Sequence, residues 1–164
     1  MAINKFVISF FLYGILSFAA YLITGYTVAA WIIYLFLLAP FYGLCLAYIV
    51  TLAISKRGST VRLRKPQLLY SLVGFQGLAI LASPTSCFGF KQGNACYSFI
   101  QTVYVNLFTD ANLQQMETTV PHWWGVNTAF PVLVGLHAVS IALVLVSLQF
   151  RVIPPISTDS IDSV

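Results

Sequence analysis

From Phe6 to Ser55 the chain contains no Asp, Glu, Lys or Arg. A helix that crosses the hydrocarbon core of a bilayer needs about 20 consecutive apolar residues, so this stretch is too long for one crossing and suits two. The sequence Thr24-Gly25-Tyr26-Thr27 interrupts it, and Gly25 can supply a tight turn. The chain is therefore predicted to cross a membrane twice near its N-terminus.

The composition of the whole chain supports a membrane location. Only 7% of the 164 residues are charged and 59% are hydrophobic, whereas about a quarter of the residues of a soluble domain are charged. Two further apolar runs follow the first stretch. We predict an all-α integral membrane protein, with one four-helix transmembrane domain over residues 1–150 and a flexible polar tail over 151–164. The four predicted transmembrane helices cover residues 6–23, 28–53, 67–83 and 124–150.

The distribution of positive charge indicates how the helices are oriented. Residues 56–65 contain five of the eight Lys and Arg and no acid, namely Lys56, Arg57, Arg62, Arg64 and Lys65. Short loops rich in Lys and Arg stay cytoplasmic, and four crossings place both termini on that same side. The net charge of +4 is then explained by topology and by attraction to anionic lipid headgroups, without any nucleic-acid partner.

The predicted outer loop, residues 84–123, is the longest segment outside the helices. It holds Cys87 and Cys96, which an oxidising compartment would allow to form a disulfide. Within it, residues 97–108 place polar side chains on one helical face and mostly apolar ones on the other. This pattern predicts an amphipathic helix that lies on the membrane surface or on the helix bundle. The chain has three cysteines and no Cys-x-x-Cys, so a thiol-exchange relay is not supported.

Small residues recur on three of the predicted helices at spacings that place them on one helical face. In lipid, such faces let two helix backbones approach closely. We expect each of these helices to pack against another one, either in this chain or in a partner subunit. The residues are Ala39, Gly43 and Ala47 in the second helix, Gly74 and Gly77 in the third, and Gly135, Ala138 and Ala142 in the fourth.

A single ionisable side chain, His137, lies inside a predicted transmembrane helix. An unsatisfied polar group in hydrocarbon is strongly destabilising, so His137 needs a partner. One interpretation is a hydrogen bond to Gln76, which lies at the same depth in the preceding helix. An axial bond to haem or chlorophyll is the second, and contact with a quinone or a lipid headgroup is the third. Elsewhere, Ser9, Tyr13 and Ser17 recur at a spacing of four in the first helix.

No combination of residues predicts catalysis or metal binding. The four carboxylates, Asp110, Glu117, Asp159 and Asp162, all lie outside the predicted helices, and phosphate-binding glycine loops and His-Glu metal motifs are absent from the sequence. We therefore expect a non-enzyme.

The predicted function is that of a small subunit, or an assembly or stabilising factor, of a larger membrane complex, which we expect to be photosynthetic or respiratory. The alternatives are a pigment- or haem-binding protein that uses His137 and a small transporter or channel. The expected partners are the lipid bilayer and other membrane-protein subunits. The expected location is a bacterial inner membrane, a thylakoid or a membrane of the secretory pathway.

Overall fold

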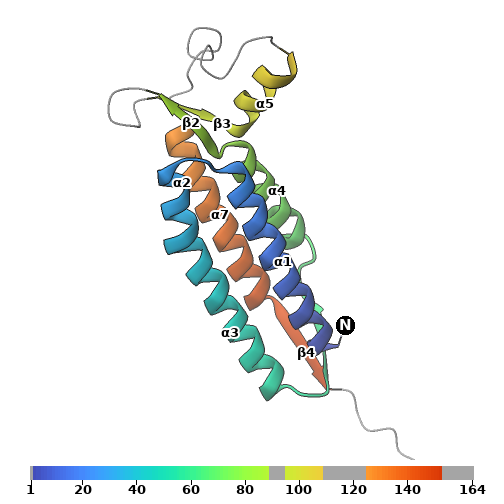
Figure 1. The fold of residues 1–164 in the computed structure, drawn as a ribbon. Helices are drawn as coiled ribbons and strands as arrows, with labels where there is room; N and C mark the ends of the chain where they lie inside the picture. The colour runs from blue at the N-terminus through green and yellow to red at the C-terminus, as the bar shows by residue number, and fades with distance from the viewer. Residues whose placement is uncertain (1, 89–94, 109–124, 153–164) are drawn as a thin grey trace, which may run out of the picture.

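The described chain passes four times between the two ends of a helical bundle (Figure 1). The computed structural model describes residues 2–88, 95–108 and 125–152. α1 (Ile3–Thr24) is followed by a continuous helical segment made of α2 (Val28–Ile32), η1 (Ile33–Leu38) and α3 (Ala39–Ser55). α4 (Leu68–Leu81) and α7 (Val126–Val146) complete the bundle and pack against each other.

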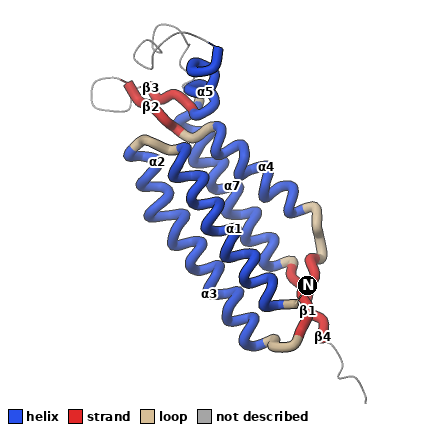
Figure 2. The backbone as a smooth tube through the Cα atoms, turned by 45° about the vertical axis from the view of Figure 1, so that its right-hand side comes forward, coloured by secondary structure: helices blue, strands red, loops and turns tan. Residues whose placement is uncertain are grey.

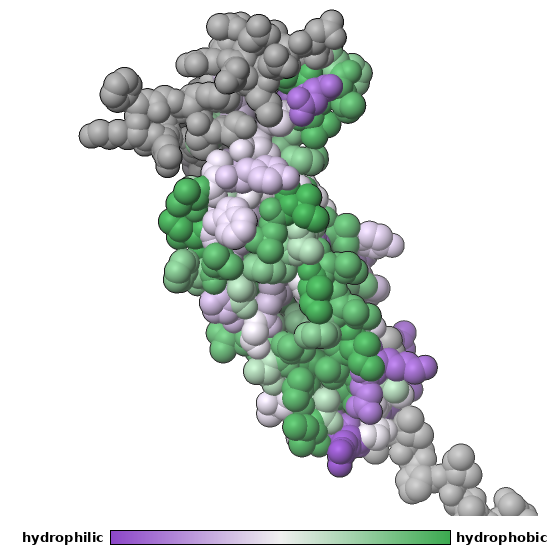
Figure 3. All heavy atoms as spheres, viewed as in Figure 1, coloured by the Kyte–Doolittle hydropathy of each residue, from purple (hydrophilic) through white to green (hydrophobic). Residues whose placement is uncertain are grey.

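Among the described residues, three helices are long and apolar enough to cross a membrane, namely Ile3–Thr24, Val28–Ser55 and Thr128–Val146. The chain is thus a multi-pass membrane protein, and large apolar side chains cover the outside of the bundle (Figure 3). α4 has 14 residues, which makes it about 21 Å long at 1.5 Å per residue. Because this is shorter than the hydrocarbon core of about 30 Å, the fourth predicted crossing stays a prediction.

The second long helix contains Pro40 and nevertheless continues to Ser55. A proline inside an α-helix has no N–H to donate, and its ring clashes with the carbonyl four residues earlier. Here η1 is a turn of π-helix, in which the Ala39 N–H donates to the Tyr34 carbonyl five residues before it. This wider turn accommodates Pro40 without ending the helix.

At one end of the bundle, β1 (Ser59–Leu63) and β4 (Leu148–Val152) form a two-stranded antiparallel sheet. Ala2 bridges to Thr60, so both ends of the described chain meet here (Figure 2). Two predictions are therefore wrong: residues 56–65 are not only a loop, and the last helix ends at Val146 rather than at residue 150. The sequence of 148–152, Leu-Gln-Phe-Arg-Val, alternates apolar and polar residues, which is the pattern of a strand. Most of the predicted tail, residues 153–164, lies outside the described residues.

At the opposite end lie β2 (Pro84–Phe88), β3 (Ala95–Ser98) and α5 (Phe99–Phe108). The helix predicted in residues 97–108 is confirmed, but part of its polar face is turned inward. Gln101 is buried and accepts hydrogen bonds from the backbone and the hydroxyl of Ser98. The apolar Leu107 and Phe108 are instead 71% and 73% exposed. The buried face of α5 is therefore not simply its apolar one, since it contains Gln101 as well as Val105.

The β2–β3 pairing sets Cys87 directly opposite Cys96. Opposed Cα atoms of antiparallel strands are about 4.5–5.5 Å apart, which is inside the range of about 4.4–6.8 Å that a disulfide spans. The register is thus compatible with the predicted disulfide. The third cysteine, Cys45, is a free thiol buried in α3.

Candidate functional site

His137 is enclosed in the centre of the bundle, with 0% of its surface exposed. The Tyr21 ring approaches it edge-on, with 5.9 Å between the ring centroids. Tyr21 in turn packs on Tyr34 at 5.2 Å, and Tyr34 meets Phe130 at 5.8 Å. The interior next to His137 is therefore filled by aromatic side chains from α1, η1 and α7.

Both ring nitrogens of His137 have hydrogen-bond partners. Nδ1 lies 3.3 Å from the carbonyl oxygen of Leu72 in α4, and Nε2 lies 3.0 Å from the hydroxyl of Tyr42 in α3. A carbonyl oxygen only accepts, so we assign the proton of the neutral imidazole to Nδ1. Nε2 is then the acceptor, and the Tyr42 hydroxyl donates to it.

The Tyr42 hydroxyl connects His137 to a longer polar network. It lies 2.6 Å from the Ser17 hydroxyl, which must donate to it because the proton of Tyr42 is given to His137. Gln76 Nε2 donates to Ser17 at 2.7 Å, and the Tyr13 hydroxyl donates to Gln76 Oε1 at 2.8 Å. One consistent arrangement of protons thus satisfies side chains from α1, α3, α4 and α7.

The prediction that Gln76 and His137 form a direct hydrogen bond is wrong. Gln76 turns toward α1, where it binds Tyr13 and Ser17, and two hydroxyls separate it from His137. The two residues nevertheless belong to one network. They are connected by Ser17, which the sequence singles out only by its spacing from Tyr13, and by Tyr42, which no sequence pattern selects.

The hydrogen bonds to both ring nitrogens of His137 leave neither nitrogen free to coordinate a haem or chlorophyll. Haem or chlorophyll coordination would need a free nitrogen of His137, so either the bond to Tyr42 or the bond to Leu72 would have to break. Among the described residues, no group of three or more His, Cys, Asp or Glu could hold a metal ion. In this structure His137 forms a polar contact between α7 and its neighbours α3 and α4.

A second close contact joins the turn after α1 to the core. A Cβ on Gly25 would lie 2.6 Å from the Cε2 atom of Tyr34, whose hydroxyl shares a 2.8 Å hydrogen bond with Ser83. Gly25 has φ of −110°, so the close approach of Tyr34, not a left-handed turn, requires glycine here. The Tyr21 hydroxyl, in the same region, is buried without a hydrogen-bond partner in the described part of the chain.

The predicted small-residue faces have free space in front of them. A Cβ on any of Gly43, Gly74, Gly77 or Gly135 would meet no atom within 4 Å. Gly43, Ala47, Gly74 and Ala142 are exposed, while Ala39, Gly77, Gly135 and Ala138 are half-buried. The described chain therefore does not use these glycines to bring its own helices together.

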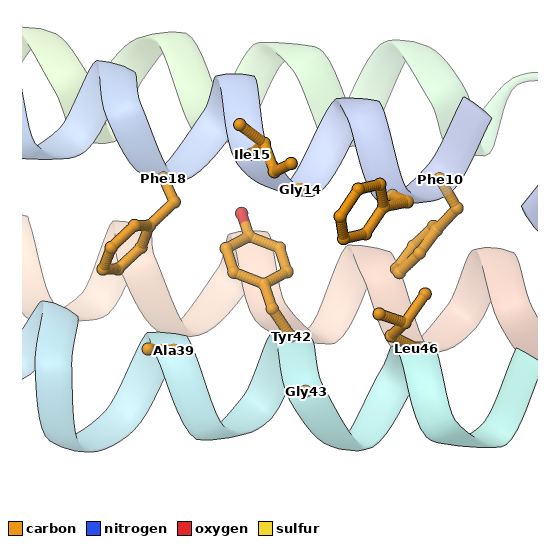
Figure 4. A pocket seen from close by; sticks show the side chains of 9 residues that line it. Phe10, Gly14, Ile15, Phe18, Ala39, Tyr42, Gly43 and Leu46 are labelled. Carbon is orange, nitrogen blue, oxygen red and sulfur yellow. The ribbon is translucent and has the colours of Figure 1, made fainter. Parts of the chain in front are cut away.

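The open glycine of α3 belongs to a groove between α1 and α3 (Figure 4). Its volume is about 220 Å³. Gly14 on α1 and Ala39 and Gly43 on α3 leave it open, and a Cβ on Gly14 also meets nothing within 4 Å. Larger side chains surround these small residues, namely Phe10, Phe11, Ile15, Phe18, Tyr42 and Leu46.

The basic residues of the predicted loop lie at the end of the bundle that carries the β1–β4 sheet. Hydrophilic residues gather there at the lower end of the molecule (Figure 3). All five basic residues of the predicted loop are exposed, namely Lys56, Arg57, Arg62, Arg64 and Lys65. In comparisons with known proteins, the chain matches no family model, no curated protein and no solved structure.

Proposed function

We propose that this chain is a non-catalytic subunit, or an assembly or stabilising factor, of a larger membrane complex. In this proposal the groove between α1 and α3 receives a transmembrane helix of another subunit. The observation that carries the proposal is the free space in front of Gly14 and Gly43, which lie on the two helices that form the groove. Glycine in the middle of a helix is destabilising by about 1 kcal/mol relative to alanine, and packing within this chain does not require it at these positions.

The shape and chemistry of the groove favour an apolar helix as its occupant. Lipid tails are as apolar as leucine, so helices associate in a membrane by close packing at small residues. Gly14, Ala39 and Gly43 offer such a surface, with phenylalanines on either side. The single proton of the Tyr42 hydroxyl is given to His137, so this side chain has no hydrogen left to donate to an occupant of the groove.

The experiment is purification of the tagged chain from its native membrane in mild detergent, followed by identification of the proteins that accompany it. We expect a stoichiometric set of subunits with the unmodified chain and its loss with Gly14→Val or Gly43→Val. Gly74→Val is the matched control, because Gly74 is an equally open helical glycine outside the groove. A chain that purifies alone, or whose partners survive both groove substitutions, would refute the proposal.

The topology belongs to the same proposal: α4 is a fourth crossing, both termini are cytoplasmic, and Cys87 is bonded to Cys96. The meeting of Ala2 and β4 with β1 at one end of the bundle supports an even number of crossings. The opposed positions of the two cysteines support the disulfide. An energy-converting host, photosynthetic or respiratory, is our favoured complex because an aromatic core around one central histidine suits pigment or haem surroundings.

The two alternative functions are supported less well by the geometry. A pigment or haem ligated by His137 would have to displace Tyr42 or Leu72. A transporter or channel needs a polar path between the helices, and here the Tyr21 and Tyr34 rings fill the space beside His137. Loss of an absorbance band on His137→Ala would restore the first alternative.

A further inference from the structure

The register of the β1–β4 sheet sorts its side chains onto two faces. Residues directly opposite each other in an antiparallel pair share a face, and successive residues alternate. Thr60 pairs with Arg151 and Arg62 pairs with Gln149, so these four polar residues lie on one face. The other face carries Val61, which is only 5% exposed, paired with Phe150.

Arg62 and Arg151 are diagonal neighbours on the polar face. Such neighbours have Cα atoms about 7–8 Å apart, a spacing that lets two guanidinium groups reach one phosphate between them. Both arginines are exposed, and both line a cleft of about 630 Å³ with Thr60 and Gln149. The Thr60 hydroxyl donates to the Arg151 carbonyl at 3.2 Å, which ties the two strands together beside the cleft.

The described part of the chain supplies no acid to neutralise the positive charge of this face. Residues 2–88, 95–108 and 125–152 contain no Asp or Glu, so neither arginine has a carboxylate partner in the described part of the chain. Lys56, Arg57 and Arg64 add further charge at the same end of the bundle. An anion would therefore meet donors without having to displace an acid of the described residues.

The position of the sheet selects the kind of anion. β1 begins four residues after α3 ends at Ser55, and β4 begins two residues after α7 ends at Val146. These helices are parts of candidate membrane spans, so the sheet lies where the hydrocarbon meets the lipid headgroups.

We propose that the polar face of the β1–β4 sheet binds the headgroup of an anionic phospholipid of the adjacent leaflet. Arg62 and Arg151 hold its phosphate, since the planar guanidinium group binds phosphate oxygens in a bidentate manner. This proposal does not depend on the α1–α3 groove, and its test leaves the groove unaltered.

The test uses the full-length chain, stripped of lipid and kept in a non-ionic detergent. Its melting temperature is measured against rising concentrations of phosphatidylglycerol, with phosphatidylcholine as the neutral comparison. The buffer contains about 0.5 M salt, so that charges more than several ångströms apart are screened. We expect half-saturation with phosphatidylglycerol at a concentration at least about tenfold lower than with phosphatidylcholine, in keeping with two basic contacts.

The variant Arg62→Gln/Arg151→Gln should lose this preference. Lys56→Gln/Arg57→Gln removes the same charge outside the sheet and should keep it to within about threefold. If the double arginine variant does not fold, the single variants Arg62→Gln and Arg151→Gln are measured, and each should lose part of the preference. Equal losses in the two double variants would show diffuse attraction only and overturn the proposal. So would stabilisation by inorganic phosphate as strong as that by the lipid, because the ligand would then be a free anion.

Discussion

Replacing Tyr42 by phenylalanine tests whether the polar network holds the four helices together. The substitution keeps the ring and removes a hydroxyl that lies 2.6 Å from Ser17 Oγ and 3.0 Å from His137 Nε2. Hydrogen bonds between membrane helices contribute about 0.6 kcal/mol on average and up to about 1.7 kcal/mol. A buried acceptor left without a donor, here His137 Nε2, adds about 1–3 kcal/mol. We expect Tyr42→Phe to lower the free energy of unfolding by about 2–5 kcal/mol.

Tyr21→Phe is the matched control for this substitution. The Tyr21 hydroxyl is also buried but has no partner in the described part of the chain, so its removal should be neutral or stabilising. Both variants are unfolded reversibly in mixed micelles of mild detergent and SDS, and the free energies are compared. A loss for Tyr42→Phe no larger than that for Tyr21→Phe would refute the network as a source of stability.

The remaining predictions concern packing, redox state and topology. Gly25→Ala should lower the free energy of unfolding by about 1–3 kcal/mol, because its Cβ would lie 2.6 Å from the Tyr34 ring. Gly14→Ala should not lower it, because a Cβ there meets no atom within 4 Å. Thermal unfolding of the two variants tests this difference. Alkylation of the denatured, unreduced chain followed by mass spectrometry should label Cys45 alone, and label Cys87 and Cys96 only after reduction; labelling of all three without reductant would exclude the disulfide. Reporter fusions to the two ends of the chain should both be active on the cytoplasmic side, and opposite locations would show that α4 does not cross the membrane.

The sequence predicted those parts of the fold that depend on local hydropathy. The absence of charge between Phe6 and Ser55 correctly indicated two long helices, and the second was predicted over 28–53 against an observed 28–55. The β1–β4 sheet was missed because its strands pair residues as far apart as Ser59 and Val152. No local pattern in one strand indicates a partner at such a separation.

The candidate site was only partly predictable for a related reason. Sequence position gives the depth of a residue in the membrane but not the direction in which its side chain points around the bundle. His137 and Gln76 were correctly judged to need polar partners, yet Gln76 turns toward α1 and bonds with Ser17. The four-residue spacing of Tyr13 and Ser17 was a usable signal, since it places both on one helical face. Tyr42, one of nine tyrosines, carried no such signal.

The measurement that tests the proposed function most directly is site-specific photo-crosslinking in the native membrane. A diazirine-bearing amino acid replaces Leu46, which lines the α1–α3 groove, or Leu44, which is 71% exposed two residues away and does not line it. If the groove holds a helix of another subunit, irradiation will join position 46, but not position 44, to one defined protein. Lipid adducts alone at position 46, or the same protein adducts from both positions, would contradict the proposal.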